Sequence, residues 1–199
     1  MNPIKTLVKE NKLPQNLRTK PCAIIMGRTG VGKTTLVNKI CGTNYKAGAG
    51  SGSITRLLYV HDVNYGQKPF SVIDTPGTNS KCETYKHAFL LREALTSKPL
   101  HTIFIIIKYD CRFDTMLETY LEQQEPVYNY DNKIVVMISH WDNSKEPEKD
   151  FPQICELFEE CCSNIICYSE KSLETNIANL MYACISNMTA KNTQRRIFS

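Results

Sequence analysis

Residues 27–34 have the sequence Gly27-Arg28-Thr29-Gly30-Val31-Gly32-Lys33-Thr34, a complete GxxxxGK[ST] pattern. The pattern follows an apolar run at Cys22–Met26 and opens a segment, Thr34–Cys41, whose apolar residues recur at helical spacing. A strand, a glycine-rich turn and a helix start, in that order, form a loop whose backbone N–H groups can surround phosphates. We therefore expect residues 27–34 and Thr35 to bind phosphates, with Lys33 bridging the outer phosphates and Thr34 giving its hydroxyl to Mg²⁺.

A second motif, Asp74-Thr75-Pro76-Gly77, follows another apolar run. Taken alone it could be an ordinary turn, since Pro and Gly favour turns. Downstream of a complete phosphate loop it predicts that Asp74 holds Mg²⁺ through water and that Gly77 offers its N–H to the γ-phosphate. The Gly-, Ala- and Ser-rich stretch 46–55 is suited to a switch that the γ-phosphate orders. Thr55 is the candidate for a second hydroxyl ligand of Mg²⁺, and the alternative is a threonine at a strand edge.

The third motif is SHWD at residues 139–142, which ends a further apolar run. A carboxylate at Asp142 can accept hydrogen bonds from both N1 and the exocyclic N2 of guanine, whereas adenine offers no such pair of donors. Asp142 is therefore expected to select guanine, although an isolated aspartate here would be interpreted as a helix cap. The usual pattern is [NT]KxD, so Ser139 replaces Asn or Thr, and His140 replaces the lysine whose stem covers the base. An imidazole can stack on a purine, so His140 is expected to contact the base.

Short apolar runs alternate with helical patterns along the chain, which indicates βαβ units and a parallel sheet. Strands are expected at 22–26, 57–60, 70–73, 102–107, 134–138 and 164–167, and helices at 34–41, 85–95, 115–124, 151–162 and 173–188. The second and third strands are expected to pair antiparallel across residues 64–66. The order predicts an α/β, Ras-like P-loop NTPase fold: a mostly parallel six-stranded sheet with one antiparallel edge strand and helices on both faces. Ser169 and Glu170 follow the last strand, where such domains bring a loop under the base.

The last predicted helix carries one apolar stripe, which is expected to pack on the sheet. Its members are Leu173, Ile177, Leu180, Met181, Cys184, Ile185 and Met188. We assign the domain to residues 21–190, preceded by an N-terminal extension at 1–20 and followed by a basic tail at 191–199, which is expected to be solvated.

Length and composition limit the classes of protein to which the chain can belong. Its 199 residues fit one α/β domain. The net charge of +4, from 24 basic and 20 acidic residues, does not argue for nucleic-acid binding. The nine cysteines are scattered, and the start of the chain has no signal-peptide pattern, so we expect reduced thiols in the cytoplasm. No apolar run approaches the ~20 residues that span a bilayer.

Taken together, GRTGVGKTT, SIT, DTPG and SHWD, in that order, resemble the AIG-type G domains, known in vertebrates as GIMAP GTPases. These are relatives of the septins and of the chloroplast import receptor GTPases. The segment 100–115, LHTIFIIIKYDCRFDT, also resembles the stretch that this family carries between its DTPG and guanine motifs. The resemblance runs from about Cys22 to about Met188. It implies tight binding of GTP and GDP, slow hydrolysis, self-association through the nucleotide face, and frequent peripheral attachment to intracellular membranes.

Hydrolysis would be phosphoryl transfer to water, catalysed mostly by positioning and charge. The catalytic residues expected within one chain are Lys33, Thr55 and Gly77, and those expected to hold Mg²⁺ are Thr34, Thr55 and, through water, Asp74. Ras-type enzymes place a water-orienting glutamine just after Gly77, but this chain has Thr78-Asn79-Ser80. A second copy could supply an arginine; Arg28 and Arg112 are both candidates, and His87 is a weaker one. We therefore expect a slow monomer that a homodimer stimulates.

Two other functions are compatible with the same motifs. The first is a GTP-binding scaffold that assembles with its own kind and barely hydrolyses. The second is a P-loop kinase or ATPase, which would need an arginine-rich lid, whereas adjacent arginines occur here only at Arg195–Arg196.

Overall fold

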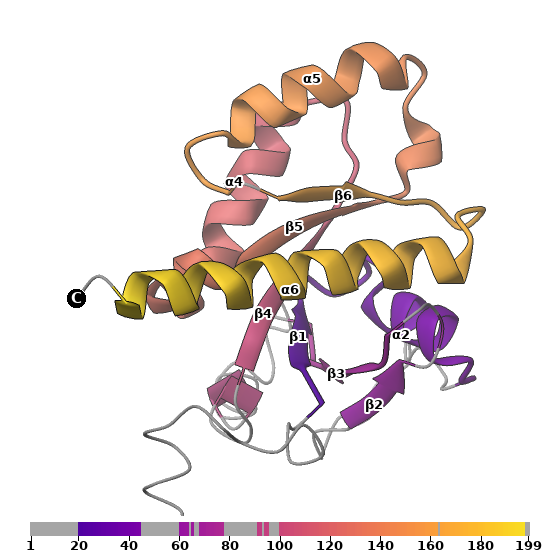
Figure 1. Cartoon of the computed structure of the whole chain (residues 1–199). Coiled ribbons are helices and arrows are strands. Elements are labelled where there is room, and N and C mark those ends of the chain that lie inside the picture. Colours follow the sequence, from indigo (N-terminus) through magenta and orange to yellow (C-terminus); the bar gives the residue numbers. More distant parts are fainter. Residues whose placement is uncertain are drawn as a thin grey trace, which may run out of the picture.

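The computed structural model describes residues 20–44, 60–63, 65, 68–77, 91–92, 94–95, 100–162 and 164–197. Its centre is one six-stranded sheet in the order β2-β3-β1-β4-β5-β6 (Figure 1). The strands are β1 (Cys22–Met26), β2 (Val60–Val63), β3 (Phe70–Asp74), β4 (Leu100–Lys108), β5 (Ile134–Ser139) and β6 (Ile165–Cys167). Only the edge strand β2 is antiparallel, to β3, so the predicted Ras-like sheet is confirmed.

Pairing in the sheet brings the three motifs to one edge. Ile25 of β1 is paired with Asp74 of β3 and with Phe104 of β4, and Lys108 of β4 is paired with Ser139 of β5. Because these strands are parallel, the loops that follow their carboxyl ends lie side by side, as expected at a ligand-binding edge of an open α/β sheet. The sequence motifs are therefore neighbours in space although they lie far apart along the chain.

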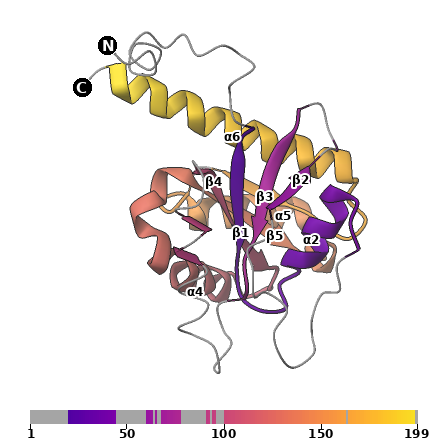
Figure 2. The same cartoon turned by 90° about the horizontal axis from the view of Figure 1, so that it is seen from below.

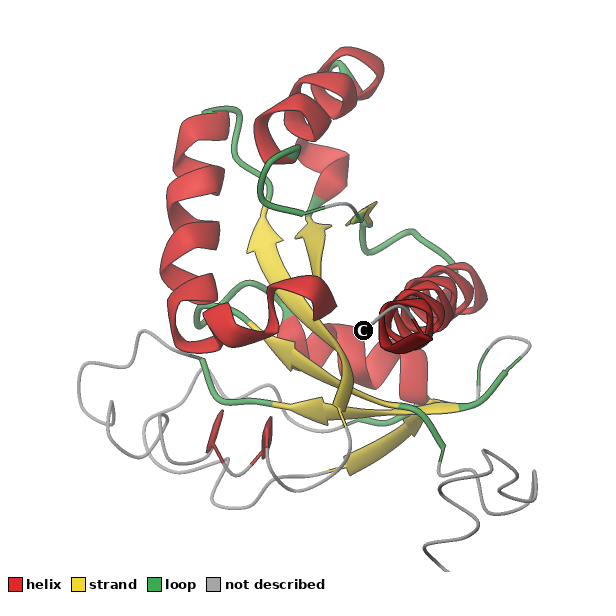
Figure 3. Cartoon of the chain, turned by 60° about the vertical axis from the view of Figure 1, so that its left-hand side comes forward, coloured by secondary structure: helices red, strands yellow, loops and turns green. Residues whose placement is uncertain are grey.

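Helices cover both faces of the sheet (Figures 2 and 3). They are α2 (Lys33–Cys41), α4 (Phe113–Gln124), α5 (Pro147–Phe158) and α6 (Glu174–Ile197), with 3₁₀ segments η2 (Glu125–Lys133) and η3 (Trp141–Asn143). One apolar core lies between the sheet and helices α2 and α6. The other lies under α4, α5 and the short helical piece at 91–95. Burial on both faces explains why β1 is apolar throughout and β5 is apolar up to the buried Ser139 at its end.

Two predicted elements, the strand at 57–60 and the helix at 151–162, are shifted along the chain in the structure. The strand expected at 57–60 is observed at Val60–Val63, and residues 57–59 lie outside the described residues. The helix expected at 151–162 begins at Pro147 and ends at Phe158. Pro147 lies in the first turn of α5, where the N–H that proline lacks would have no partner within the helix. A proline at this place is a signal for the start of a helix. Of the helix expected at 85–95, the described residues 91, 92, 94 and 95 are helical.

The apolar stripe of α6 is narrower than expected. Ile177, Met181 and Ile185 are buried against the sheet, whereas Leu173 and Leu180 are 61% and 51% exposed. At about 100° per residue, Leu180 lies roughly 100° around the helix from Met181, on the flank of the buried row. Met188 lies beyond the side chains that the structure describes. No helix in the described ranges is both long and apolar enough to cross a membrane.

Candidate nucleotide-binding site

The glycine-rich loop between β1 and α2 has the backbone shape that a phosphate loop requires. Gly27 has φ +149°, and a Cβ placed on it would lie 2.5 Å from the carbonyl oxygen of Ile106. Gly32 has φ +95°, in the left-handed region that favours glycine, and its carbonyl accepts the Leu36 N–H that begins α2. Side chains at these two positions would strain the loop or push it away from β4. The residues predicted to bind phosphates therefore form one continuous loop at a helix start.

Lys33 is folded back onto this loop. Its ammonium donates to the carbonyl oxygens of Gly27 and Arg28, each at 2.9 Å, and the residue is only 7% exposed. Burial lowers the pKa of Lys33 to about 8, while nearby Asp74 acts in the opposite direction. A buried ammonium held only by neutral carbonyls is an incompletely compensated charge. The loop therefore offers a cation at the place where the pattern predicts the outer phosphates.

Thr34 and Asp74 meet beside Lys33. The Thr34 hydroxyl donates to Oδ2 of Asp74 at 3.0 Å, and the other carboxylate oxygen, Oδ1, is buried with no hydrogen-bond partner in the structure. Burial raises the pKa of Asp74, and the Thr34 hydrogen bond and the charge of Lys33 oppose this rise. A hydroxyl and an unsatisfied carboxylate oxygen are ligands of the kind that Mg²⁺ prefers, so this pair fits the predicted metal.

No cluster of three or more His, Cys, Asp or Glu side chains suited to a metal ion occurs among the residues that the structure describes. This agrees with a Mg²⁺ site of the P-loop type, because such a site takes one or two protein ligands and completes its shell with water and phosphate oxygens. Thr55, the other predicted ligand, lies outside the described residues.

The DTPG motif is fixed against both β1 and the phosphate loop. The backbone N–H and the hydroxyl of Thr75 both donate to the carbonyl oxygen of Ile25, at 3.2 and 2.9 Å. Gly77 lies so close to Thr29 that a Cβ on Gly77 would be 2.2 Å from the Thr29 hydroxyl oxygen and 2.7 Å from the Thr29 nitrogen. Only glycine allows this approach, which places the Gly77 backbone beside the predicted phosphate site.

The SHWD motif is joined to the phosphate loop by its first residue. The buried Ser139 hydroxyl lies 2.9 Å from the carbonyl oxygen of Val31 and 3.3 Å from that of Ile107. His140 has φ +56°, and its Nδ1 lies 3.0 Å from the same hydroxyl oxygen. The His140 ring also reaches the phosphate loop, since its Cε1 is 3.9 Å from a Cβ built on Gly32. Asp142 is exposed in η3, so its carboxylate is accessible to a ligand.

The loop after β6 is tied to the same place. The Trp141 N–H donates to the carbonyl oxygen of Tyr168 at 3.1 Å. Lys39 of α2 donates to the carbonyl oxygen of Glu170 at 2.6 Å, and the Ser169 N–H donates to the Ser172 hydroxyl at 3.0 Å. The loop that carries Ser169 and Glu170 is therefore joined both to the SHWD loop and to α2.

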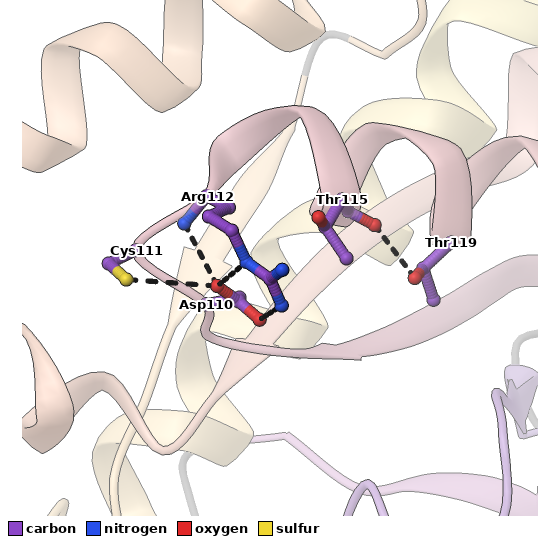
Figure 4. A network of polar contacts seen from close by, with 5 residues as sticks. All are labelled: Asp110, Cys111, Arg112, Thr115 and Thr119. Carbon is purple, nitrogen blue, oxygen red and sulfur yellow. Dashed lines mark hydrogen bonds and ion pairs between the residues drawn. The ribbon is translucent and has the colours of Figure 1, made fainter.

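Arg28 and Arg112, the two arginines that a second copy was predicted to supply to the site, differ in their surroundings. Arg28 forms an ion pair with Glu122 of α4, and its Nε is buried without a partner. Arg112 stands at the start of α4, with its side chain 75% exposed and bonded to Asp110 at 3.3 Å (Figure 4). The backbone N–H and the side chain of Arg112 lower the pKa of Asp110. His87 lies outside the described residues.

Sequence analysis missed two residues that border this site. Tyr109, directly after β4, donates its hydroxyl to Asp150 of α5 at 2.5 Å. Both line a cleft of about 710 Å³ that also touches Arg28 and Val31 of the phosphate loop. Tyr109 was detectable, because it ends a buried strand at the same edge as the motifs, whereas the position of Asp150 on an exposed helix gave no signal.

Comparisons with known proteins agree with this geometry. The profile of the family described as "50S ribosome-binding GTPase" matches residues 22–140, more than half of the chain. GTPase Der of Ureaplasma parvum is 29% identical over 147 residues, which cover 70% of this chain and 31% of that protein. GTPase Der of Halothermothrix orenii is 38% identical over 58 residues, covering 29% of this chain and 13% of the relative. The chain thus spans about a third of the length of the GTPase Der relatives from Ureaplasma parvum.

Solved structures share the fold at low identity. A variant of SsGBP superposes with a TM-score of 0.64 at 18% identity and covers 95% of this chain and 63% of its own. Toc33 from Arabidopsis thaliana, in complex with Mg²⁺ and GMPPNP, gives 0.59 at 15%, with coverage of 92% and 90%. Era, in complex with MgGDPNP and a segment of 16S ribosomal RNA, gives 0.59 at 20%, with coverage of 83% and 56%. With the fold, the phosphate loop and the family profile in agreement, the chain belongs to the family described as 50S ribosome-binding GTPase.

Proposed function

We propose that this GTPase domain binds GTP and GDP with Mg²⁺, hydrolyses GTP slowly as a switch, and is stimulated when two copies meet across their nucleotide faces. The observation that carries the proposal is the cluster of Lys33, Thr34 and Asp74. It combines a buried ammonium held only by carbonyl oxygens with a hydroxyl–carboxylate pair that has one unsatisfied buried oxygen. Such a cluster places a buried positive charge beside a hydroxyl and a carboxylate oxygen, which suits a nucleotide phosphate bound together with Mg²⁺.

Each residue of the cluster has a defined task in this proposal. Lys33 would leave the two carbonyl oxygens and bind the β- and γ-phosphates, while Thr34 would hold Mg²⁺ through its hydroxyl and Asp74 would hold it through water. When bound, Mg²⁺ neutralises charge that develops on the phosphates. The backbone N–H of Gly77 donates to the γ-phosphate, and Thr55 completes the metal shell.

Guanine selection is assigned to the SHWD loop. The Asp142 carboxylate accepts from N1 and N2 of guanine, and the His140 ring packs against the base. The proximity of His140 to Gly32 supports this, because it sets the base end of the site directly beside the phosphate end. Ser169 and Glu170 border the base on the side of α2.

The slow rate and the dimer follow from where the arginines lie. Arg28 is engaged by Glu122, so it is a poor source of charge for the γ-phosphate of its own chain. Arg112 is exposed and held only by a surface ion pair, which is a weak interaction, so a second copy can recruit it. An arginine supplied in trans can raise turnover by ~10³–10⁵. Solved neighbours support the dimer: dimerisation is important for the GTPase activity of the chloroplast translocon components Toc33 and Toc159, and a Toc33 variant with one arginine replaced by alanine is deficient in dimerisation.

The test is turnover of GTP and ATP over a wide range of protein concentration, with Asp142→Asn and Arg112→Ala beside the wild type. We expect GTP alone to be hydrolysed, faster per molecule as concentration rises, and Arg112→Ala to remove only the concentration dependence. GTP binding with turnover near zero at every concentration would favour the self-assembling scaffold instead. ATP turnover that Asp142→Asn leaves unchanged would contradict guanine selection.

We further propose membership of the AIG-type branch, a cytoplasmic location with peripheral attachment to intracellular membranes, and no nucleic-acid partner. The mild net charge of +4 supports the last point. Ribosome binding is the competing function, favoured by the family's description and by the RNA complex of Era. Cosedimentation with ribosomes in the GTP- and GDP-bound states separates the two, since a nucleotide-dependent ribosome complex would contradict our proposal.

A further inference from the structure

We propose that Tyr109 is a positioning residue for guanine specificity, which with Asp150 holds the loop that presents Asp142. This inference rests on the proposed assignment of Asp142 to guanine. It concerns a residue outside the SHWD motif that acts on Asp142 through its contacts with the rest of the SHWD loop.

Tyr109 contacts the beginning and the middle of the SHWD loop. Its backbone N–H donates to the carbonyl oxygen of Ser139 at 2.9 Å. Its ring, 8% exposed, packs edge-to-face on Trp141, with centroids 5.4 Å apart and an interplanar angle of 88°. The residue therefore fixes both neighbours of His140, whose left-handed backbone sets the direction of the loop.

The Tyr109 hydroxyl also fixes the far end of the loop. It donates to Oδ2 of Asp150 at 2.5 Å, and the Ser144 hydroxyl donates to the same oxygen at 2.6 Å. These two donors lower the pKa of Asp150, so its carboxylate stays ionised near neutral pH and accepts both bonds. The Asp150 N–H donates to the carbonyl oxygen of Glu146, which anchors the acceptor in the first turn of α5.

Asp142 lies between these fixed points and has few restraints of its own. The turn around it is closed by two backbone bonds, from Asn143 to His140 at 3.0 Å and from Ser144 to Trp141 at 3.1 Å. A carboxylate can accept from N1 and N2 together only if its plane is set correctly against the base. Tyr109 and Asp150 thus determine the orientation of Asp142 by holding the loop on both sides of it.

The experiment compares Tyr109→Phe with Tyr120→Phe. Both changes remove one hydroxyl from a buried tyrosine and keep the ring, but the Tyr120 hydroxyl donates to the carbonyl oxygen of Cys161 at 3.2 Å, outside the SHWD loop. Dissociation constants are measured for GDP and for inosine diphosphate, which lacks the exocyclic amine of guanine. The dissociation constant of inosine diphosphate divided by that of GDP reports how well the Asp142 carboxylate is oriented toward guanine. A general loss of stability does not change this ratio.

We expect Tyr109→Phe to lower the ratio about three- to tenfold, which is less than a full hydrogen bond to a charged acceptor is worth because the effect reaches Asp142 through the loop, and Tyr120→Phe to leave it unchanged. Asp150→Ala is expected to act like Tyr109→Phe, and Asp150→Asn, which keeps an acceptor oxygen, to retain more of the ratio. A Tyr109→Phe ratio equal to that of the wild type would overturn the inference, even if both nucleotides bound more weakly. A wild type that binds the two nucleotides equally would instead overturn the assignment of Asp142 itself.

Discussion

Replacing Lys33 by Met should stabilise the nucleotide-free domain while abolishing its affinity for nucleotide. Burial lowers the pKa of Lys33 from its usual 10.5 to about 8. This difference of about 2.5 in pKa, at about 1.36 kcal/mol per unit, corresponds to about 3.4 kcal/mol against the charged form at pH 7. Met removes that penalty but also removes two hydrogen bonds to carbonyl oxygens, worth about 0.5–1.5 kcal/mol each. We expect a net gain of about 1–2 kcal/mol, or about 2–8 °C in Tm.

The pH dependence provides a sharper test than the stability itself. The pKa of Lys33 is lower in the folded state than in the unfolded chain, so the unfolded chain binds more protons between about pH 8 and pH 10.5. The stability of the wild type therefore rises with pH through that window on account of this group. The advantage of Lys33→Met should be complete below pH 8 and disappear as the pH rises toward 10.5. Other titrating groups cancel in the difference between the two proteins.

The assay is urea unfolding of both nucleotide-free proteins from pH 7 to pH 10, with Lys39→Met as the matched control. Lys39 lies on the same helix, but its side chain is 19% exposed and paired with Glu174. We expect the control to show no gain at pH 7, and GDP to raise the Tm of the wild type but not of Lys33→Met. A Lys33→Met variant that is less stable than the wild type at pH 7, by an amount that stays constant up to pH 10, would refute the reasoning.

Three further changes test the rest of the site. Asp74→Asn should weaken GDP binding tenfold or more in Mg²⁺ and hardly at all in EDTA, as calorimetry with and without the metal will show. Gly77→Ala should weaken binding of a non-hydrolysable GTP analogue more than that of GDP, because the methyl group would lie 2.2 Å from the Thr29 hydroxyl oxygen; equal losses would contradict this. Ser139→Ala should cost about 1–3 kcal/mol in urea unfolding, since it leaves the buried carbonyl of Val31 without this donor, and should speed GDP release in stopped-flow measurements.

The fold was predictable because each motif follows an apolar strand, and parallel strands bring the loops at their ends together. The sequence pattern did not predict where each helix begins and ends, because this depends on local end signals. It also did not predict which side of a helix packs on the sheet. Pro147 starts α5 four residues before the expected Phe151. Leu180 fits the helical period but falls on the flank of α6, because the side that faces the core is formed by Ile177, Ala178, Met181, Cys184 and Ile185.

The candidate site was predictable where neighbours in sequence share a task, as in the phosphate loop. It was not predictable where a contact joins distant positions. Tyr109 and Asp150 are 41 positions apart, Arg28 and Glu122 are 94 apart, and Lys39 reaches Glu170 over 131. No local period or composition encodes such pairs, since each depends on how a helix packs against a loop that lies far away in the sequence. The residues that hold the motifs in place were therefore found only in three dimensions.

The departures from the usual [NT]KxD pattern also have a physical explanation in the structure. The Ser139 hydroxyl lies within hydrogen-bond reach of the Val31 and Ile107 carbonyl oxygens, so the task of this position is to tie the base loop to the phosphate loop and to β4. The short, buried Ser139 hydroxyl donates at this position as well as the side-chain amide of the usual Asn would. His140 keeps a left-handed backbone, which a non-glycine residue holds only when its surroundings enforce it. Those surroundings are the bond from Trp141 to Tyr168 and the turn bond from Asn143. The residues of the pattern differ from the usual ones, but the SHWD loop is still tied to the phosphate loop through Ser139, which supports the proposal that Asp142 selects guanine.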